Sequence, residues 1–100
     1  MTELIRPALY GAEHPMQALT SLGQAVAEDA GTDPKTVVQL HGPICESTDR
    51  LGQAPMPPLQ RGDLVAIGVA GAYASSMFSS YNGRPRPPEI GWDKRGLSRL

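Results

Sequence analysis

The chain has 100 residues, which is enough for one domain with a modest core. Eleven glycines, ten prolines and only 5% aromatic residues predict a loop-rich fold of short elements and exclude a helical bundle. A net charge of -1 gives no electrostatic footprint for nucleic acid, and the single cysteine excludes an internal disulfide framework. No signal peptide and no apolar run near the ~20 residues of a membrane span is present in the sequence, so we expect a cytoplasmic location with no membrane partner.

The first ten residues are mostly apolar, and Pro7 interrupts them. Proline fixes its φ and lacks a backbone donor, so we expect a strand end or an irregular corner rather than a helix through this point. Arg6 is either a solvated charge or a bidentate ligand for a carboxylate or phosphate. Tyr10 is interpreted at this point as the edge of the core.

His14 lies in a turn ahead of a periodic stretch. From Met16 the apolar side chains recur every three or four residues, and Gly31 follows the last of them. This pattern predicts a short amphipathic helix over about residues 16–29. The two histidines and the cysteine lack the spacing of zinc ligands, so we predict no metal site.

The only cysteine lies at a rigid corner. Residues 36–40 are rich in β-branched side chains and predict a strand that runs into the turn at 41–49. Pro43 stiffens this turn, which presents Cys45 and Glu46 side by side, and a thiol beside a carboxylate suits proton transfer. A lone cysteine is also commonly a small buried apolar residue, so the pattern alone leaves both interpretations open.

Residues 47–62 carry three prolines among polar residues and predict a surface loop. The stretch 64–70 is apolar on both faces, which predicts a central, buried strand. It leads into small residues around Tyr73, and small residues allow a bulky group to approach the backbone. Tyr73 is therefore either a contact for such a group or a core tyrosine with a satisfied hydroxyl.

Residues 79–89 predict a tight turn followed by a proline-rich extended segment, whereas residues 91–100 have no clear period and are assigned no structure. We therefore divide the chain into a β-domain, residues 1–90, and a divergent tail, residues 91–100. The expected fold class is mainly β, a sandwich or partly open barrel with one short helix.

Several short segments, in this order, form a specific set. They are residues 4–12 (Leu-Ile-Arg-Pro-Ala-Leu-Tyr-Gly-Ala), 41–47 (His-Gly-Pro-Ile-Cys-Glu-Ser), 62–64 (Gly-Asp-Leu), 70–73 (Ala-Gly-Ala-Tyr) and 81–87 (Tyr-Asn-Gly-Arg-Pro-Arg-Pro). The set resembles the C-terminal part of the diaminopimelate decarboxylases, which belong to the ornithine, lysine, arginine and diaminopimelate decarboxylase group of pyridoxal-phosphate enzymes with an alanine racemase-like fold. That family joins a (β/α)8 barrel, absent from this chain, to a C-terminal β-domain.

The resemblance implies a role for each of five residues. Arg6 and Tyr10 match substrate-binding residues of the family, and Glu46 matches the carboxylate that contacts the far end of the substrate. Tyr73 matches a tyrosine that contacts both the cofactor and the substrate. Cys45 matches a cysteine that crosses a homodimer interface into the neighbouring active site and donates a proton after carbon dioxide leaves.

The implied reaction converts meso-2,6-diaminopimelate to L-lysine and carbon dioxide in lysine biosynthesis, with pyridoxal 5'-phosphate as cofactor. Arg6 can take a carboxylate while Glu46 pairs with an ammonium group, which favours a substrate with two amino-acid ends. The related ornithine-type enzymes carry Cys-Asp where this chain has Cys45-Glu46. That difference favours diaminopimelate.

The chain also departs from the family pattern. Neither Lys35 nor Lys94 matches the Schiff-base lysine, which belongs to the barrel half, so we expect the chain alone to be inactive and to hold no cofactor covalently. Residues 17–34 form a longer connection than the family's usual one. We expect a truncated product, an internal start or one half of a split enzyme.

Two alternatives remain open at this stage. One is a noncatalytic β-domain that binds a partner decarboxylase barrel. The other is a nonfunctional gene product, which would expose apolar surface and self-associate. A small nucleic-acid-binding barrel is disfavoured by the charge and by the few aromatic residues.

Overall fold

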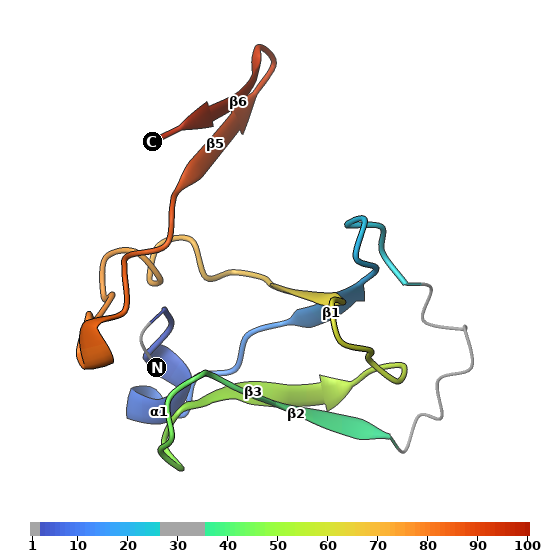
Figure 1. Cartoon of the computed structure of the whole chain (residues 1–100), viewed down its shortest axis with the longest axis vertical. Helices are drawn as coiled ribbons and strands as arrows, with labels where there is room; N and C mark the ends of the chain where they lie inside the picture. Colours follow the sequence, from blue (N-terminus) through green and yellow to red (C-terminus); the bar gives the residue numbers. More distant parts are fainter. Residues whose placement is uncertain (1–2, 27–35) are drawn as a thin grey trace.

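The computed structural model describes residues 3–26 and 36–100. Within these ranges the chain is mostly strands, with one short α-helix, α1 (Arg6–Tyr10), and a 3-10 turn, η1 (Tyr81–Gly83) (Figure 1). The strands are β1 (Met16–Leu19), β2 (Val37–His41), β3 (Arg50–Pro55), β4 (Leu64–Ile67), β5 (Ile90–Asp93) and β6 (Gly96–Arg99). The expectation of a mainly β fold with one short helix is confirmed. No helix in these ranges has the length and apolar character needed to cross a membrane.

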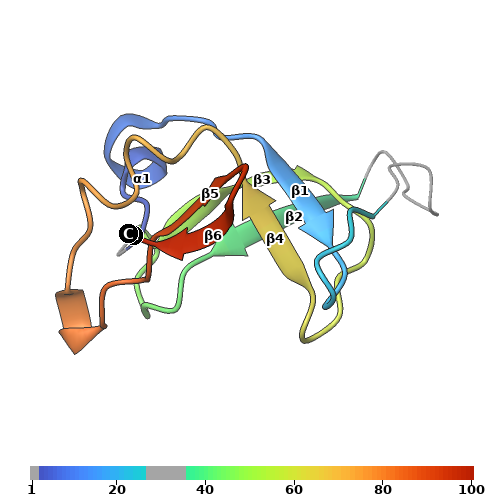
Figure 2. The same ribbon diagram turned by 90° about the horizontal axis from the view of Figure 1, so that it is seen from above.

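The strands form three antiparallel pairs, β1 with β4, β2 with β3 and β5 with β6. The β1–β4 pair crosses over the β2–β3 pair (Figure 2). The side chain of Met16 in β1 lies against the backbone of Gly52 in β3. Gly52 has φ +146° and no side chain, so the two layers approach closely there. Among the described strands the pairs do not close into a barrel.

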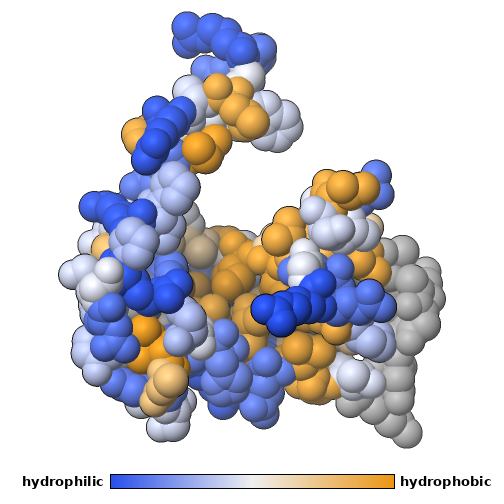
Figure 3. All heavy atoms as spheres, viewed as in Figure 1, coloured by the Kyte–Doolittle hydropathy of each residue, from blue (hydrophilic) through white to orange (hydrophobic). Residues whose placement is uncertain are grey.

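The core of the described chain is small. Its buried apolar side chains are Leu4, Ala18, Ile44 and Met56. The accessible surface is 7450 Å², whereas a folded monomer of 10.6 kDa has about 5,500 Å² by the usual scaling. The β5–β6 hairpin projects from the rest of the chain, and Trp92 in it is 83% exposed. Figure 3 shows apolar side chains on the open surface below this hairpin, so much apolar surface is left uncovered.

The helix expected over residues 16–29 is wrong where the structure describes it, because residues 16–19 form β1; residues 27–29 lie outside the described residues. In a strand alternate side chains share a face, and Ala18 is accordingly buried. Leu22, which the helical pattern placed on the apolar face, is 85% exposed. The i, i+3 spacing of Met16 and Leu19 was a coincidence in a segment too short to separate the two periods.

The predicted strand at 36–40 is confirmed as β2, but the predicted central strand at 64–70 is not central. β4 ends at Ile67, pairs only with β1 among the described strands, and leaves alternate side chains exposed. Its side chains are apolar on both faces, but none of them is fully buried.

Three further expectations are wrong. Residues 47–62 contain β3 rather than a continuous loop, and residues 91–100 form most of the β5–β6 hairpin. Pro7 does not end a strand but lies in the first turn of α1, where its missing N–H would have no helical partner.

Candidate functional site

Arg6 and Tyr73 lie together although 67 positions separate them. Arg6 begins α1, and its guanidinium carbon lies 3.8 Å from the centroid of the Tyr73 ring. A cation over an aromatic face is attracted by the negative face of the ring. The helix ends at Tyr10 because the next residue, Gly11, has φ +64° and adopts the left-handed conformation typical of a helix C-cap.

Tyr73 is held by a series of turns over residues 71–77. Its N–H donates to the carbonyl of Ala70 (2.9 Å), and its carbonyl accepts from the N–H of Met77 (3.3 Å). The side chain is 36% exposed, so the ring packs under Arg6 while part of it stays open to a ligand. The exposed position does not fit the interpretation of Tyr73 as a core tyrosine.

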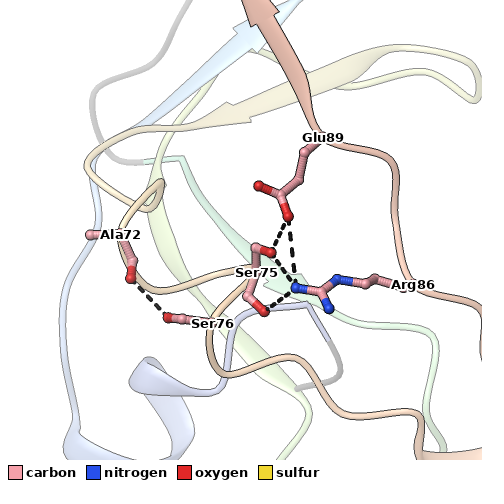
Figure 4. Close-up of polar contacts among 5 residues, drawn as sticks. All are labelled: Ala72, Ser75, Ser76, Arg86 and Glu89. Carbon is pink, nitrogen blue, oxygen red and sulfur yellow. Dashed lines mark hydrogen bonds and ion pairs between the residues drawn. The ribbon is translucent and has the colours of Figure 1, made fainter. Parts of the chain in front are cut away.

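The turn that carries Tyr73 is tied to the proline-rich segment. Arg86 donates to the carbonyl of Ser75 (2.9 Å) and to its hydroxyl (2.5 Å), and Glu89 accepts from the same hydroxyl (Figure 4). Arg86 and Glu89 also form an ion pair at 3.7 Å. The hydroxyl of Ser76 donates to the carbonyl of Ala72. These bonds fix the far end of the Tyr73 turn.

The corner that carries Cys45 is organised around Asp49, which is fully buried. The carboxylate of Asp49 accepts from the N–H of Ile44 at 2.6 Å, and its backbone carbonyl accepts from the N–H of Gly42 at 2.8 Å. Ile44 itself is buried. The next residue, Cys45, is exposed with a free thiol. The buried-apolar interpretation of this cysteine is therefore wrong for the described chain.

Glu46 is held from a distant segment. The phenol of Tyr81 donates to its Oε1 at 2.7 Å, and the hydroxyl of Thr48 donates to its Oε2 at 3.5 Å. The Glu46 carboxylate raises the pKa of Tyr81 above its ordinary value, through this hydrogen bond and through charge repulsion of the phenolate. The Glu46 carboxylate is thus oriented by Tyr81 and Thr48.

The predicted site residues therefore fall into two groups and one outlier. The first group, the arginine cluster, consists of the predicted Arg6 and Tyr73 together with His14, a buried residue that was not predicted and whose Nε2 lies 3.4 Å from Nη1 of Arg6. The second, the thiol corner, consists of residues 42–49 with Tyr81 against Glu46. Tyr10, although on α1, is 66% exposed, and its phenol makes no hydrogen bond within the described residues.

Sequence reasoning missed His14, Asp49 and Tyr81. His14 was considered only as a metal ligand, and in the described ranges no three His, Cys, Asp or Glu side chains are grouped to hold a metal ion. Asp49 carried a usable signal, because a carboxylate a few residues after a Gly-Pro corner commonly accepts local backbone N–H groups. Tyr81 carried none, since 35 positions separate it from Glu46.

Comparison with known families decides which class of protein this geometry serves. A family model described as the C-terminal sheet domain of pyridoxal-dependent decarboxylases matches residues 1–71. The chain belongs to this family. Its resemblance to the ornithine, diaminopimelate and arginine decarboxylases is thereby confirmed.

Individual relatives agree. The diaminopimelate decarboxylase of Deinococcus radiodurans is 46% identical over 92% of this chain and 22% of its own length, and that of Archaeoglobus fulgidus is 44% identical over 87% and 19%. A crystal structure of diaminopimelate decarboxylase superposes with a TM-score of 0.84 at 33% identity, covering 98% of this chain and 24% of that one. The M. jannaschii enzyme in co-complex with L-lysine gives 0.76 at 31% identity. The chain spans about a fifth to a quarter of these relatives.

The predicted site residues of this pyridoxal-dependent decarboxylase domain suit an amino-acid substrate. They offer one guanidinium, one carboxylate, one thiol and two phenols, from Arg6, Glu46, Cys45, Tyr10 and Tyr73. The guanidinium and the carboxylate suit the charged ends of an amino-acid substrate. Lys94 lies in the exposed β5–β6 turn, away from both groups, and Lys35 lies outside the described residues. The described residues therefore leave part of the Tyr73 ring exposed but offer no amine at either group for covalent attachment of a cofactor.

Proposed function

We propose that this chain is the C-terminal portion of a diaminopimelate decarboxylase, which converts meso-2,6-diaminopimelate to L-lysine and carbon dioxide. The observation that carries the proposal is the thiol corner, where an exposed Cys45 adjoins a carboxylate held in place by Tyr81. The 40–46% identity to several proteins named diaminopimelate decarboxylase supports it.

The chain's own residues divide the work of binding. Arg6 takes a substrate carboxylate, since its guanidinium is a planar donor suited to a bidentate pair. Glu46 pairs with an ammonium group and is oriented for this by Tyr81. Tyr10 completes the substrate contacts, and Tyr73 contacts both the substrate and the edge of the cofactor.

The chemistry is shared with a barrel half. Pyridoxal phosphate, bound by that barrel, supplies the electron sink for loss of carbon dioxide. Cys45 then donates the thiol proton to the α-carbon of the substrate, as a general acid placed on a stiff corner. In the assembled enzyme, a homodimer, this cysteine reaches the active site of the neighbouring subunit. The chain alone is inactive.

Reconstitution tests the proposal. Carbon dioxide release from meso-diaminopimelate with added pyridoxal phosphate is measured for this chain, for the barrel half of the Deinococcus radiodurans relative, and for the two mixed. We expect release only from the mixture. Silence of a mixture in which the two halves bind each other would contradict the proposal and favour a noncatalytic domain that occupies a decarboxylase barrel.

Substrate choice sharpens the same assay. Because Glu46 recognises the far ammonium and Arg6 a carboxylate, the mixture should prefer meso-diaminopimelate to ornithine by at least tenfold in kcat/KM. Thr48→Val, which removes the weaker hydrogen bond to Glu46, is the matched control for Tyr81→Phe, which removes the stronger one. Only Tyr81→Phe should reduce the ratio of kcat/KM for meso-diaminopimelate to kcat/KM for ornithine.

A further inference from the structure

His14 is a buried polar side chain that links the parts of the arginine cluster. It is 8% exposed, and a buried polar group needs hydrogen-bond partners. Its Nδ1 lies 3.2 Å from the carbonyl oxygen of Gly68, and its Nε2 lies 3.4 Å from Nη1 of Arg6. The ring also meets Tyr73 edge-on, with centroids 6.4 Å apart. His14 thus contacts both members of the Arg6–Tyr73 pair.

The two hydrogen-bond partners fix the proton on the ring. A carbonyl oxygen only accepts, so Nδ1 must carry the hydrogen, and a guanidinium only donates, so Nε2 must offer its lone pair. The neutral Nδ1–H tautomer is the one state that satisfies both partners. The opposite tautomer and the imidazolium would both set a donor on Nε2 against Arg6.

The Gly68 carbonyl is itself a fixed anchor. The N–H of Gly68 donates to the carbonyl of Pro15 at 2.8 Å, which extends the β1–β4 pairing by one residue. A Cβ atom on Gly68 would lie 3.0 Å from the Pro15 ring, so the backbones are in close contact. The position of the His14 ring is therefore fixed relative to the β1–β4 pair through Gly68.

We propose that His14 is a positioning residue that sets the substrate-binding arginine. Anchored on the Gly68 carbonyl, its Nε2 holds the Arg6 guanidinium over the Tyr73 ring, in the orientation that receives a substrate carboxylate. The inference rests on the proposed function for the role of Arg6 alone. The orientation of Arg6 by His14 is a separate property of this chain.

Two substitutions separate the two bonds of the ring. In His14→Gln the side-chain oxygen reaches the place of Nε2 and keeps an acceptor for Arg6. In His14→Asn the shorter amide reaches only the place of Nδ1, so it keeps the bond to Gly68 and loses Arg6. In the reconstituted complex, His14→Asn should raise KM for meso-diaminopimelate about tenfold with kcat within about threefold, while His14→Gln stays within about threefold of wild type in both.

The matched control is Gln39→Asn, at an exposed position in β2, which should change neither constant. Equal KM values for wild type and His14→Asn would overturn the inference. So would an equal loss of kcat in both His14 variants, because that result would assign the ring a structural role only.

If the mixture is inactive, the role of His14 can be tested by a measurement that does not depend on catalysis. Nitrogen-15 NMR of the full chain reports which ring nitrogen carries the hydrogen. We expect the neutral Nδ1–H tautomer for His14 at neutral pH, with coupling to the Arg6 guanidinium lost in His14→Asn and kept in His14→Gln. An Nε2–H tautomer or a charged ring would overturn the inference, whereas an inactive mixture with the expected tautomer would contradict only the proposed function.

Discussion

The arginine cluster and the thiol corner are held in different ways. In the cluster, Arg6, His14 and Tyr73 contact one another through their side chains, and the central ring is buried. At the corner, the backbone is fixed from within by Asp49, while the thiol of Cys45 is exposed. The first group is built to hold an orientation within this chain. The second holds its backbone in place and leaves its thiol exposed.

The largest effect expected from this difference is at Cys45. Cys45→Ala should lower kcat of the reconstituted complex by about 10²- to 10⁴-fold, the usual share of a general acid. The free energy of unfolding should change by less than about 0.5 kcal/mol because the side chain is exposed. Ser47→Ala, at the exposed neighbour two positions on, is the control. A fully active Cys45→Ala complex would remove the thiol from the mechanism.

Substitutions in the backbone support of the thiol corner should lower the free energy of unfolding, unlike Cys45→Ala. A Cβ on Gly42 would lie 2.6 Å from Cγ of Asp49, so Gly42→Ala should destabilise the chain by about 2–3 kcal/mol in urea unfolding. Asp49→Ala should cost about 2 kcal/mol because the Ile44 N–H loses its partner.

The double variant tests the cause. The clash in Gly42→Ala is with the Asp49 side chain. The double variant Gly42→Ala/Asp49→Ala should therefore have a free energy of unfolding within about 0.5 kcal/mol of that of Asp49→Ala alone. Additive losses would show that Gly42 matters for another reason.

A smaller effect is expected at the turn that carries Tyr73. Arg86→Ala removes two hydrogen bonds to Ser75 and should raise KM for meso-diaminopimelate about threefold by loosening the turn. Arg84→Ala, which loses only an exposed ion pair with Glu3 at 3.9 Å, is its control. Equal KM values for Arg86→Ala and Arg84→Ala would show that the hydrogen bonds to Ser75 do not affect substrate binding.

The smallest expected effect is a titration. Hydrogen bonding to Glu46 raises the pKa of Tyr81, so this bond is fully present below the ordinary tyrosine pKa and is lost as pH rises through the raised one. Glu46→Gln should therefore lower the pKa of Tyr81, followed by phenolate absorbance at alkaline pH. Glu13→Gln, at an exposed carboxylate elsewhere, should leave the titration unchanged.

The sequence predicted local features where neighbouring residues determine them. The strand at Val37–His41 and the rigid corner after it follow from β-branched residues and a Gly-Pro pair. The strand β1 was missed because four residues cannot separate a helical from an alternating pattern. The β5–β6 hairpin was missed although Gly96, at φ +113°, and the Asp93 side chain bonded to the N–H of Arg95 form its turn.

The site needed more than local pattern. Arg6 and Tyr73 are far apart in sequence, and only the family resemblance joined them. His14 escaped notice because a single histidine in a turn does not reveal its two partners. The buried state expected of β4 was wrong because apolar strands can be covered by another domain as well as by their own chain.

Alkylation of Cys45, the only cysteine in the chain, tests most directly whether the thiol corner is completed by a barrel half. The rate of iodoacetamide modification is followed by mass spectrometry of the peptide that contains Cys45, for the chain alone, with the barrel half, and with the barrel half and meso-diaminopimelate. We expect fast modification of the chain alone, slowing at least tenfold with the barrel half and further with substrate. An unchanged rate under conditions where the two halves bind each other would contradict the placement of Cys45 in a shared active site.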